Sequence, residues 1–133
     1  MTSALSPLTA TAFVAAGGAI GAVGRYALGQ AFAGLLGSSG FPWAILSVNI
    51  LGSLAMGLLF GWFASHDGGT ETQRLFLAVG ILGGFTTFSA FSLEIILLIQ
   101  RGAIALACAF IAASVIGGVA ALYLGLTLAK GSA

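Results

Sequence analysis

The stretch of this chain richest in chemically capable groups is Gly83-Gly84-Phe85-Thr86-Thr87-Phe88-Ser89-Ala90-Phe91-Ser92, which interrupts an otherwise apolar segment. It contains two glycines, four hydroxyl side chains and three phenylalanines. Lipid offers no partner to hydroxyl or backbone groups, so such a stretch is expected to face protein, an ion or a wet cavity. These residue types favour a binding or permeation site over a lipid-facing wall.

The same stretch is expected to break its helix. Each glycine of the Gly83-Gly84 pair lowers helix stability by about 1 kcal/mol relative to alanine, and the hydroxyls of Thr86 and Thr87 can bond to backbone carbonyls. A break near mid-membrane would release carbonyl oxygens, which suit a small cation such as Na⁺. The alternative is a bent helix whose hydroxyls bond back by one turn, and these residues alone leave both open.

Two phenylalanines of the stretch, Phe88 and Phe91, are three residues apart and therefore share a helix face. A phenyl ring has a positive edge, and edges that line a narrow passage attract an anion weakly. Ser89 and Ser92 add hydroxyl donors nearby. Aromatic residues at this spacing usually form core, and the interleaved hydroxyls are the reason to consider an ion pathway.

Three further polar residues lie in apolar surroundings. The amide of Asn49 can donate two hydrogen bonds to an anion or make an interhelical hydrogen bond, which is the commoner role. Arg25 can raise the anion concentration at a mouth, but we favour a structural role in which it neutralises helix carbonyls or reaches the headgroups. Glu94 is either a protonatable gate or a hydrogen-bonded structural group, and the sequence does not separate the two.

Composition defines the class of protein that must position these groups. Of 133 residues, 59% are hydrophobic and 5% are charged, whereas a soluble domain has about 25% charged residues. We therefore predict an all-α integral membrane protein with a single domain. The net charge of +1 gives no reason to expect a nucleic-acid partner. No metal-ligand cluster, phosphate loop or nucleophile with a base is present in the sequence, which argues against an enzyme.

Four stretches are long and apolar enough to span a bilayer, which takes about 20 residues. Turn signals separate the first two at Gly37-Ser38-Ser39-Gly40, and Arg101-Gly102 leaves room only for a tight hairpin before the last. The predicted helices cover approximately 8–36, 41–65, 75–100 and 103–129.

Small residues recur at four-residue spacing in three of these spans. Helices in lipid associate through such residues because their backbones can then approach closely. We predict packing seams along rows in the first, second and fourth spans: Gly17 and Gly21; Asn49, Ser53, Gly57 and Gly61; Ala109, Ala113, Gly117 and Ala121.

Flanking charges do not favour either orientation in the membrane. With the N-terminus inside, Arg74 and Lys130 lie on the cytoplasmic side, and Arg25 and Arg101 lie toward the outside. Because positive charge normally decides topology, this tally predicts insertion both ways up, the alternative being a weak bias set by other features. Two oppositely oriented copies would form an antiparallel homodimer, which would supply partners for the small-residue faces and buried polar groups.

These motifs resemble those of the Fluc/CrcB family of fluoride channels, and the resemblance covers nearly the whole chain. The helix-three motif is specific, whereas the glycine-rich start alone is weak. The matching pieces are Gly17-Gly18-Ala19-Ile20-Gly21-Ala22-Val23-Gly24-Arg25-Tyr26, Phe41-Pro42-Trp43 with Val48-Asn49, and the motif that runs from Gly83 to Glu94.

The resemblance implies a dual-topology, antiparallel homodimer with two pores that passively exports fluoride across the inner (plasma) membrane. It implies that Phe88 and Phe91 are the paired pore phenylalanines and that Asn49 coordinates fluoride. It also implies a central structural Na⁺ held by the carbonyls of Gly83 and Thr86 from both subunits. The remaining expected pore residues are Thr87, Ser89, Ser114 and Phe110, the last where the family can have a tyrosine; Gly118 stands where a further serine can occur.

Two other classes of protein remain as alternatives. A small dual-topology, proton-coupled multidrug transporter is also a four-helix antiparallel dimer, but it needs a carboxylate near the middle of its first helix, and this first span has none. A non-transporting subunit of a membrane complex would show no ion flux in liposomes.

Overall fold

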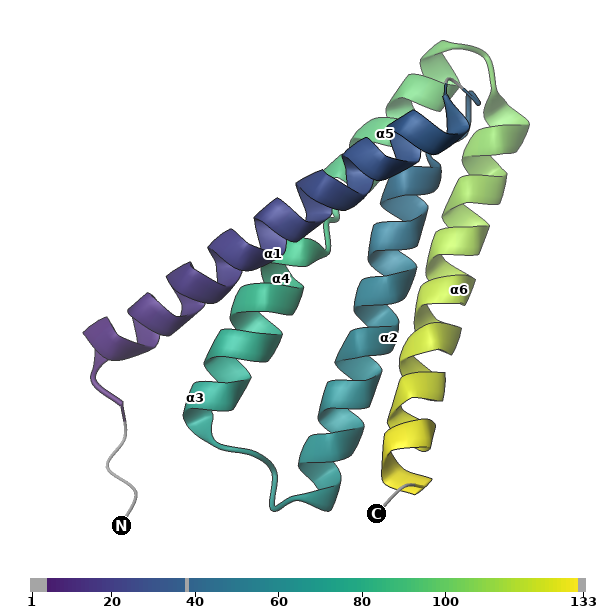
Figure 1. The fold of residues 1–133 in the computed structure, drawn as a ribbon. Helices are drawn as coiled ribbons and strands as arrows, with labels where there is room; N and C mark the ends of the chain where they lie inside the picture. The colour runs from purple at the N-terminus through teal and green to yellow at the C-terminus, as the bar shows by residue number, and fades with distance from the viewer. Residues whose placement is uncertain (1–4, 38, 132–133) are drawn as a thin grey trace.

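The chain folds into an all-helical bundle in a computed structural model that describes residues 5–37 and 39–131; Ser38 of the predicted first turn lies outside them (Figure 1). The first two spans are the helices α1 (Pro7–Leu36) and α2 (Trp43–Ser65), and the last is α6 (Ile104–Gly131). The third is built from four pieces: α3 (Glu71–Gln73), η1 (Arg74–Leu82), α4 (Gly83–Phe85) and α5 (Ser89–Gln100). Among the described residues, four segments have the length and hydropathy to cross a membrane, which confirms the predicted number.

Local sequence explains where the spans begin and turn. Ser6 accepts a hydrogen bond from the Thr9 amide as the N-cap of α1, with Pro7 in the first turn. Thr70 and Gln73 form a reciprocal capping box at the start of the third span. Gly102, at a φ of 72°, makes the tight hairpin between α5 and α6, because this backbone conformation strongly favours glycine.

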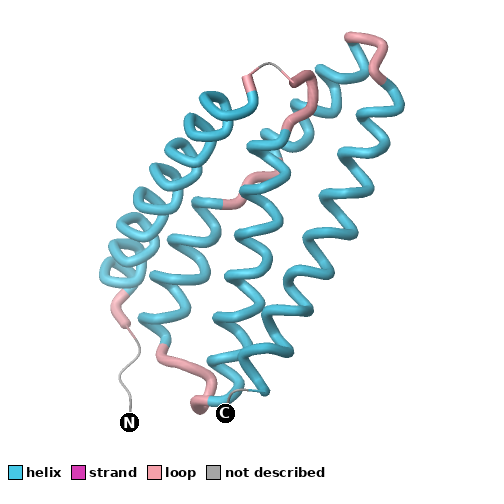
Figure 2. Tube along the Cα trace, turned by 45° about the vertical axis from the view of Figure 1, so that its right-hand side comes forward, coloured by secondary structure: helices cyan, strands magenta, loops and turns pink. Residues whose placement is uncertain are grey.

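The spans associate mainly as two pairs. In one, α2 runs alongside α6; in the other, α1 packs against η1 and α4 (Figure 1). Figure 2 shows the non-helical connection between α4 and α5 as a loop within the bundle. η1 has the wider turns of a π-helix, which are often found near functional sites. The interruption of the third span lies inside the bundle, close to both α1 and α2.

Glycines permit the close approach of helices in both pairs. A Cβ atom added at Gly21 would overlap Ile81 O and lie 2.8 Å from Phe85 N, and one at Gly57 would overlap Leu122 O. These contacts confirm the predicted seams on α1 and α2.

Of the predicted seam on α6, Gly117 packs against α2, since a Cβ atom there would lie 3.0 Å from Ile50 Cδ1, whereas Ala109 is exposed in the single chain. The α6 face that meets α2 also includes Gly118 and Gly125. A four-residue step advances about 40° beyond a full turn of a 3.6-residue helix, so a row of such steps leaves the contact face.

Few large side chains are buried within a single chain. The fully buried ones among the described residues are Phe63, Phe110, Leu98 and Val48, and one small core joins Leu46, Leu98, Ala107 and Phe110. Many apolar side chains on every span are exposed. In a membrane protein such surfaces contact lipid or another subunit, so the fold needs a bilayer around it.

Candidate ion-binding site

The third span is interrupted between Phe85, the last residue of α4, and Ser89, the first residue of α5. Thr86 has an extended backbone, with φ −77° and ψ 157°. Its amide and its hydroxyl both donate to Leu82 O, at 3.0 and 2.9 Å, and so complete the preceding helix. The Ala90 amide donates to Thr87 Oγ1 at 3.2 Å, so a threonine side chain caps the start of the next helix.

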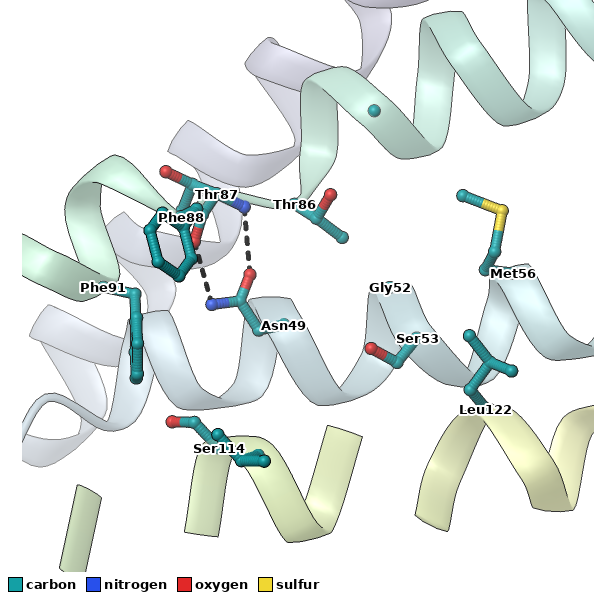
Figure 3. A pocket seen from close by; sticks show the side chains of 12 residues that line it. Asn49, Gly52, Ser53, Met56, Thr86, Thr87, Phe88, Phe91, Ser114 and Leu122 are labelled. Carbon is teal, nitrogen blue, oxygen red and sulfur yellow. Dashed lines mark hydrogen bonds between the residues drawn. The ribbon is translucent and has the colours of Figure 1, made fainter. Parts of the chain in front are cut away.

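Asn49 of α2 bonds to the backbone of this interruption twice. Its Nδ2 donates to Thr87 O at 3.0 Å, and the Thr87 amide donates to Asn49 Oδ1 at 2.9 Å (Figure 3). The interhelical hydrogen bond considered for this residue is therefore present. A primary amide has two N–H donors, and one of those of Asn49 is not used in this pair.

Gly83 O and Thr86 O are among the carbonyl oxygens that lose their usual helical donors at the interruption. The Thr87 amide, which would bond Gly83 O in a continuous helix, is directed to Asn49 instead. The Ala90 amide, which would bond Thr86 O, is directed to Thr87 Oγ1. Among the described residues, no three His, Cys, Asp or Glu side chains gather to hold a metal ion, so a cation at this site would depend on carbonyl oxygens.

Arg25 reaches the same interruption from α1. Its Nε donates to Gly84 O at 3.2 Å, in a partly buried position. The guanidinium thus lies at the carbonyl end of α4, where the helix dipole is negative and a cation is favourable. This contact matches the structural role that the sequence favoured, the neutralisation of helix carbonyls.

A pocket of about 520 Å³ lies beside the interruption, between α2, α6 and the third span, and is open on one side. Figure 3 shows the Asn49 amide, Thr86, Ser53 and the Phe88 and Phe91 rings around it. The Phe88 and Phe91 ring centroids are 5.7 Å apart, and Phe88 is 78% exposed. The lining residues are Asn49, Gly52, Ser53, Met56, Gly83, Thr86, Thr87, Phe88, Phe91, Ser114, Val115 and Leu122.

Ser114 is the unsatisfied polar group of this pocket. Its hydroxyl oxygen is buried and has no hydrogen-bond partner among the described residues. A serine in a membrane helix can bond back to the preceding turn, but this one does not. An unpaired buried hydroxyl costs free energy, which a ligand that accepts its proton would recover.

The other predicted site residues lie outside the pocket lining. Ser89 is exposed, with its hydroxyl 3.5 Å from Thr87 Oγ1. Phe110 is fully buried in the small core, with its ring centroid 5.2 Å from that of Phe91, so its place in a pore stays a prediction. Glu94 is half-buried on α5 and makes no hydrogen bond or ion pair with the described residues.

The sequence did not anticipate five residues of the pocket lining as site residues: Gly52, Ser53, Met56, Val115 and Leu122. Gly52, three residues after Asn49 on α2, lies against Thr86 and Phe85 so closely that a Cβ atom there would overlap Thr86 Cγ2. A glycine has no side chain to mark it as functional. The only signal in the sequence is that residues 49 and 52 share a helix face.

Known proteins match this chain over nearly its whole length. A family described as CrcB-like protein, Camphor Resistance (CrcB), matches residues 12–126. A protein of Novosphingobium aromaticivorans named fluoride-specific ion channel FluC is 54% identical over 127 residues, 95% of this chain and 100% of the relative. Proteins with the same name from Erythrobacter litoralis and Sphingopyxis alaskensis are 50% and 52% identical, covering 96% and 88% of this chain and 97% and 92% of the relatives. This chain belongs to the CrcB family.

Proposed function

We propose that this chain is a passive fluoride-selective channel of the inner (plasma) membrane. The relatives named fluoride-specific ion channel support this function, because they match the chain over nearly its whole length. The observation that carries it is the pocket, where a spare Asn49 N–H and the unpaired Ser114 hydroxyl lie among phenylalanine rings.

The chemistry of the pocket suits a small, strongly hydrated anion. Fluoride can cross only where fixed groups replace its water shell. Neutral donors and ring edges supply this replacement without a permanent positive charge that would hold the ion. Arg25 donates from its Nε to Gly84 O and is not part of the pocket lining.

A second, oppositely oriented copy is proposed to complete each pathway. The pocket is open in the single chain, and Phe88 in its wall is largely exposed. A two-fold axis in the membrane plane would cover both pockets at once and produce two pores. The small core of the single chain supports the same assembly, because its exposed apolar faces need a partner or lipid.

A structural Na⁺ is proposed between the two copies. The Gly83 and Thr86 carbonyls fit a hard cation, because both have lost their helical donors and both residues line the pocket. The same two carbonyls of the second copy would complete the ligand set. The ion would supply positive charge where two half-helices end, which stabilises released carbonyls.

The test is fluoride efflux from liposomes that contain the purified protein, with chloride efflux measured in parallel. We expect fluoride to leave and chloride to stay. Ser114→Ala should lower fluoride efflux by roughly tenfold, because a hydrogen bond to a charged group contributes about 1.5–3 kcal/mol. Ser65→Ala is the matched control, because the Ser65 hydroxyl bonds back to Gly61 O outside the pocket.

The outcomes separate the alternatives. Absence of fluoride efflux from a folded dimer would rule out the channel and favour a non-transporting subunit. Proton-driven uptake of an organic cation would favour a multidrug transporter. Unchanged efflux from Ser114→Ala, with selective fluoride flux in the wild type, would remove only the role given to that hydroxyl.

A further inference from the structure

The side chain of Asn49 forms hydrogen bonds with both backbone polar groups of one residue of the third span, Thr87. The Thr87 N–H donates to Asn49 Oδ1 at 2.9 Å, and the Thr87 carbonyl accepts from Asn49 Nδ2 at 3.0 Å. Only one orientation of the amide makes both bonds, since the reverse would place donor against donor and oxygen against oxygen. The arrangement reproduces the pair of bonds that two residues exchange in an antiparallel ladder.

Thr87 needs such a partner because it has left the helix. In a continuous helix its amide would bond Gly83 O, and its carbonyl would accept from the Phe91 amide. Both groups lie in a segment surrounded by apolar spans, where an unpaired backbone group costs several kcal/mol. Asn49 satisfies both, so the extended backbone at Thr86 can persist.

We propose that Asn49 is a positioning residue that holds the third span open between Phe85 and Ser89. Removal of its amide would leave the Thr87 N–H either without a partner or free to donate to Gly83 O. The second outcome would withdraw one of the two carbonyls on which a cation at this site depends. The importance of this for transport rests on the proposed channel function, but the bonds themselves do not.

The position of Gly52 supports the same role for α2. The absence of a side chain there lets Thr86 and Phe85 lie directly against the helix, one turn from Asn49. The amide can therefore reach Thr87 with its short side chain. The proposal also limits the direct role of Asn49 in ion binding to one N–H, because the other is committed to Thr87 O.

The experiment measures the backbone in fluoride-free protein. Isotope-labelled protein in lipid nanodiscs would be studied by NMR, following the hydrogen exchange of the Thr87 amide and the ¹³Cα shifts of Thr86 and Thr87. In Asn49→Leu, which is similar in size and cannot form either bond, we expect one of two changes. Either the Thr87 amide exchanges roughly tenfold faster, as for a lost hydrogen bond, or both ¹³Cα shifts move to helical values.

Either change supports the proposal; unchanged exchange together with unchanged shifts would overturn it. Asn49→Ala gives a second, smaller replacement in case the leucine variant does not fold. Ser53→Ala is the matched control, because it lies one turn further along α2 in the same pocket wall and leaves both Asn49 bonds intact. Because the NMR experiment contains no fluoride, a negative result in it would not contradict the channel function. Absence of fluoride efflux, in turn, would not contradict the positioning role of Asn49.

Discussion

Gly52→Ala tests whether the contact between α2 and the interruption sets the geometry of the site. The added Cβ would overlap Thr86 Cγ2 and lie 3.3 Å from Phe85 Cδ1. Thr86 resists rotation because its hydroxyl donates to Leu82 O at 2.9 Å. Overpacking costs about 1–3 kcal/mol, and alanine regains about 1 kcal/mol of helix propensity over glycine. The upper part of that range applies here, so the net cost should be about 1–2 kcal/mol, or roughly a five- to thirtyfold shift in an equilibrium.

The assay is a double-mutant cycle read by fluoride efflux from liposomes. Gly52→Ala should lower the efflux by roughly tenfold, and Thr86→Ser in the same chain should restore most of it, because serine keeps the hydroxyl and lacks the Cγ2 methyl. Gly34→Ala is the control, since an added Cβ there meets no atom within 4 Å. Wild-type efflux from Gly52→Ala, or no recovery in the double variant, would refute the reasoning.

Three further expectations concern the pathway and the assembly. Phe88→Ile should lower fluoride efflux by roughly tenfold through loss of the ring edge, while the dimer still forms on size-exclusion chromatography; full efflux from that dimer would argue against a pore position. Asn49→Asp should abolish efflux, because a carboxylate repels an anion by about 4 kcal/mol at 4 Å and an effective dielectric constant of about 20; undiminished conduction would contradict it. In a Cys108→Ala background, Asp67→Cys and Ser39→Cys, which lie at exposed positions of two different loops, should each be labelled from both sides of the membrane, and one-sided labelling would remove the dual insertion.

The number of spans could be predicted from sequence because hydropathy and length are local properties. Each apolar stretch exceeds what a bilayer requires, whatever it packs against. The glycine seam on α1 was predictable for the same reason, since only small residues allow backbones to touch in lipid. The identity of the element that packs against Gly17 and Gly21 could not be predicted, because the position of η1 depends on the path of the whole chain.

The sequence predicted which types of residue form the site better than it predicted the hydrogen bonds between them. Asn49 is a possible anion ligand or an interhelical donor by sequence alone, and its bonds to Thr87 depend on how α2 lies against the interruption. The place of Phe110 in a pore stays a prediction that comes from the resemblance alone. A tyrosine has a hydroxyl that can reach a pathway, whereas this phenylalanine is wholly apolar and is buried in the core beside Phe91. No local pattern distinguishes these two environments.

The small buried core has a consequence for how this sequence tolerates change. In a water-soluble protein, saturation mutagenesis finds its most sensitive positions at large apolar side chains, because deleting them leaves cavities. Here most such side chains lie on the outer surface, where one aliphatic group can replace another in contact with acyl chains. The intolerant positions should instead be the smallest residues, such as Gly21 and Gly57, where a single added methyl would overlap a neighbouring backbone. In saturation mutagenesis of this chain, the small residues should therefore tolerate substitution less well than the large apolar residues, which is the opposite of the pattern in a water-soluble protein.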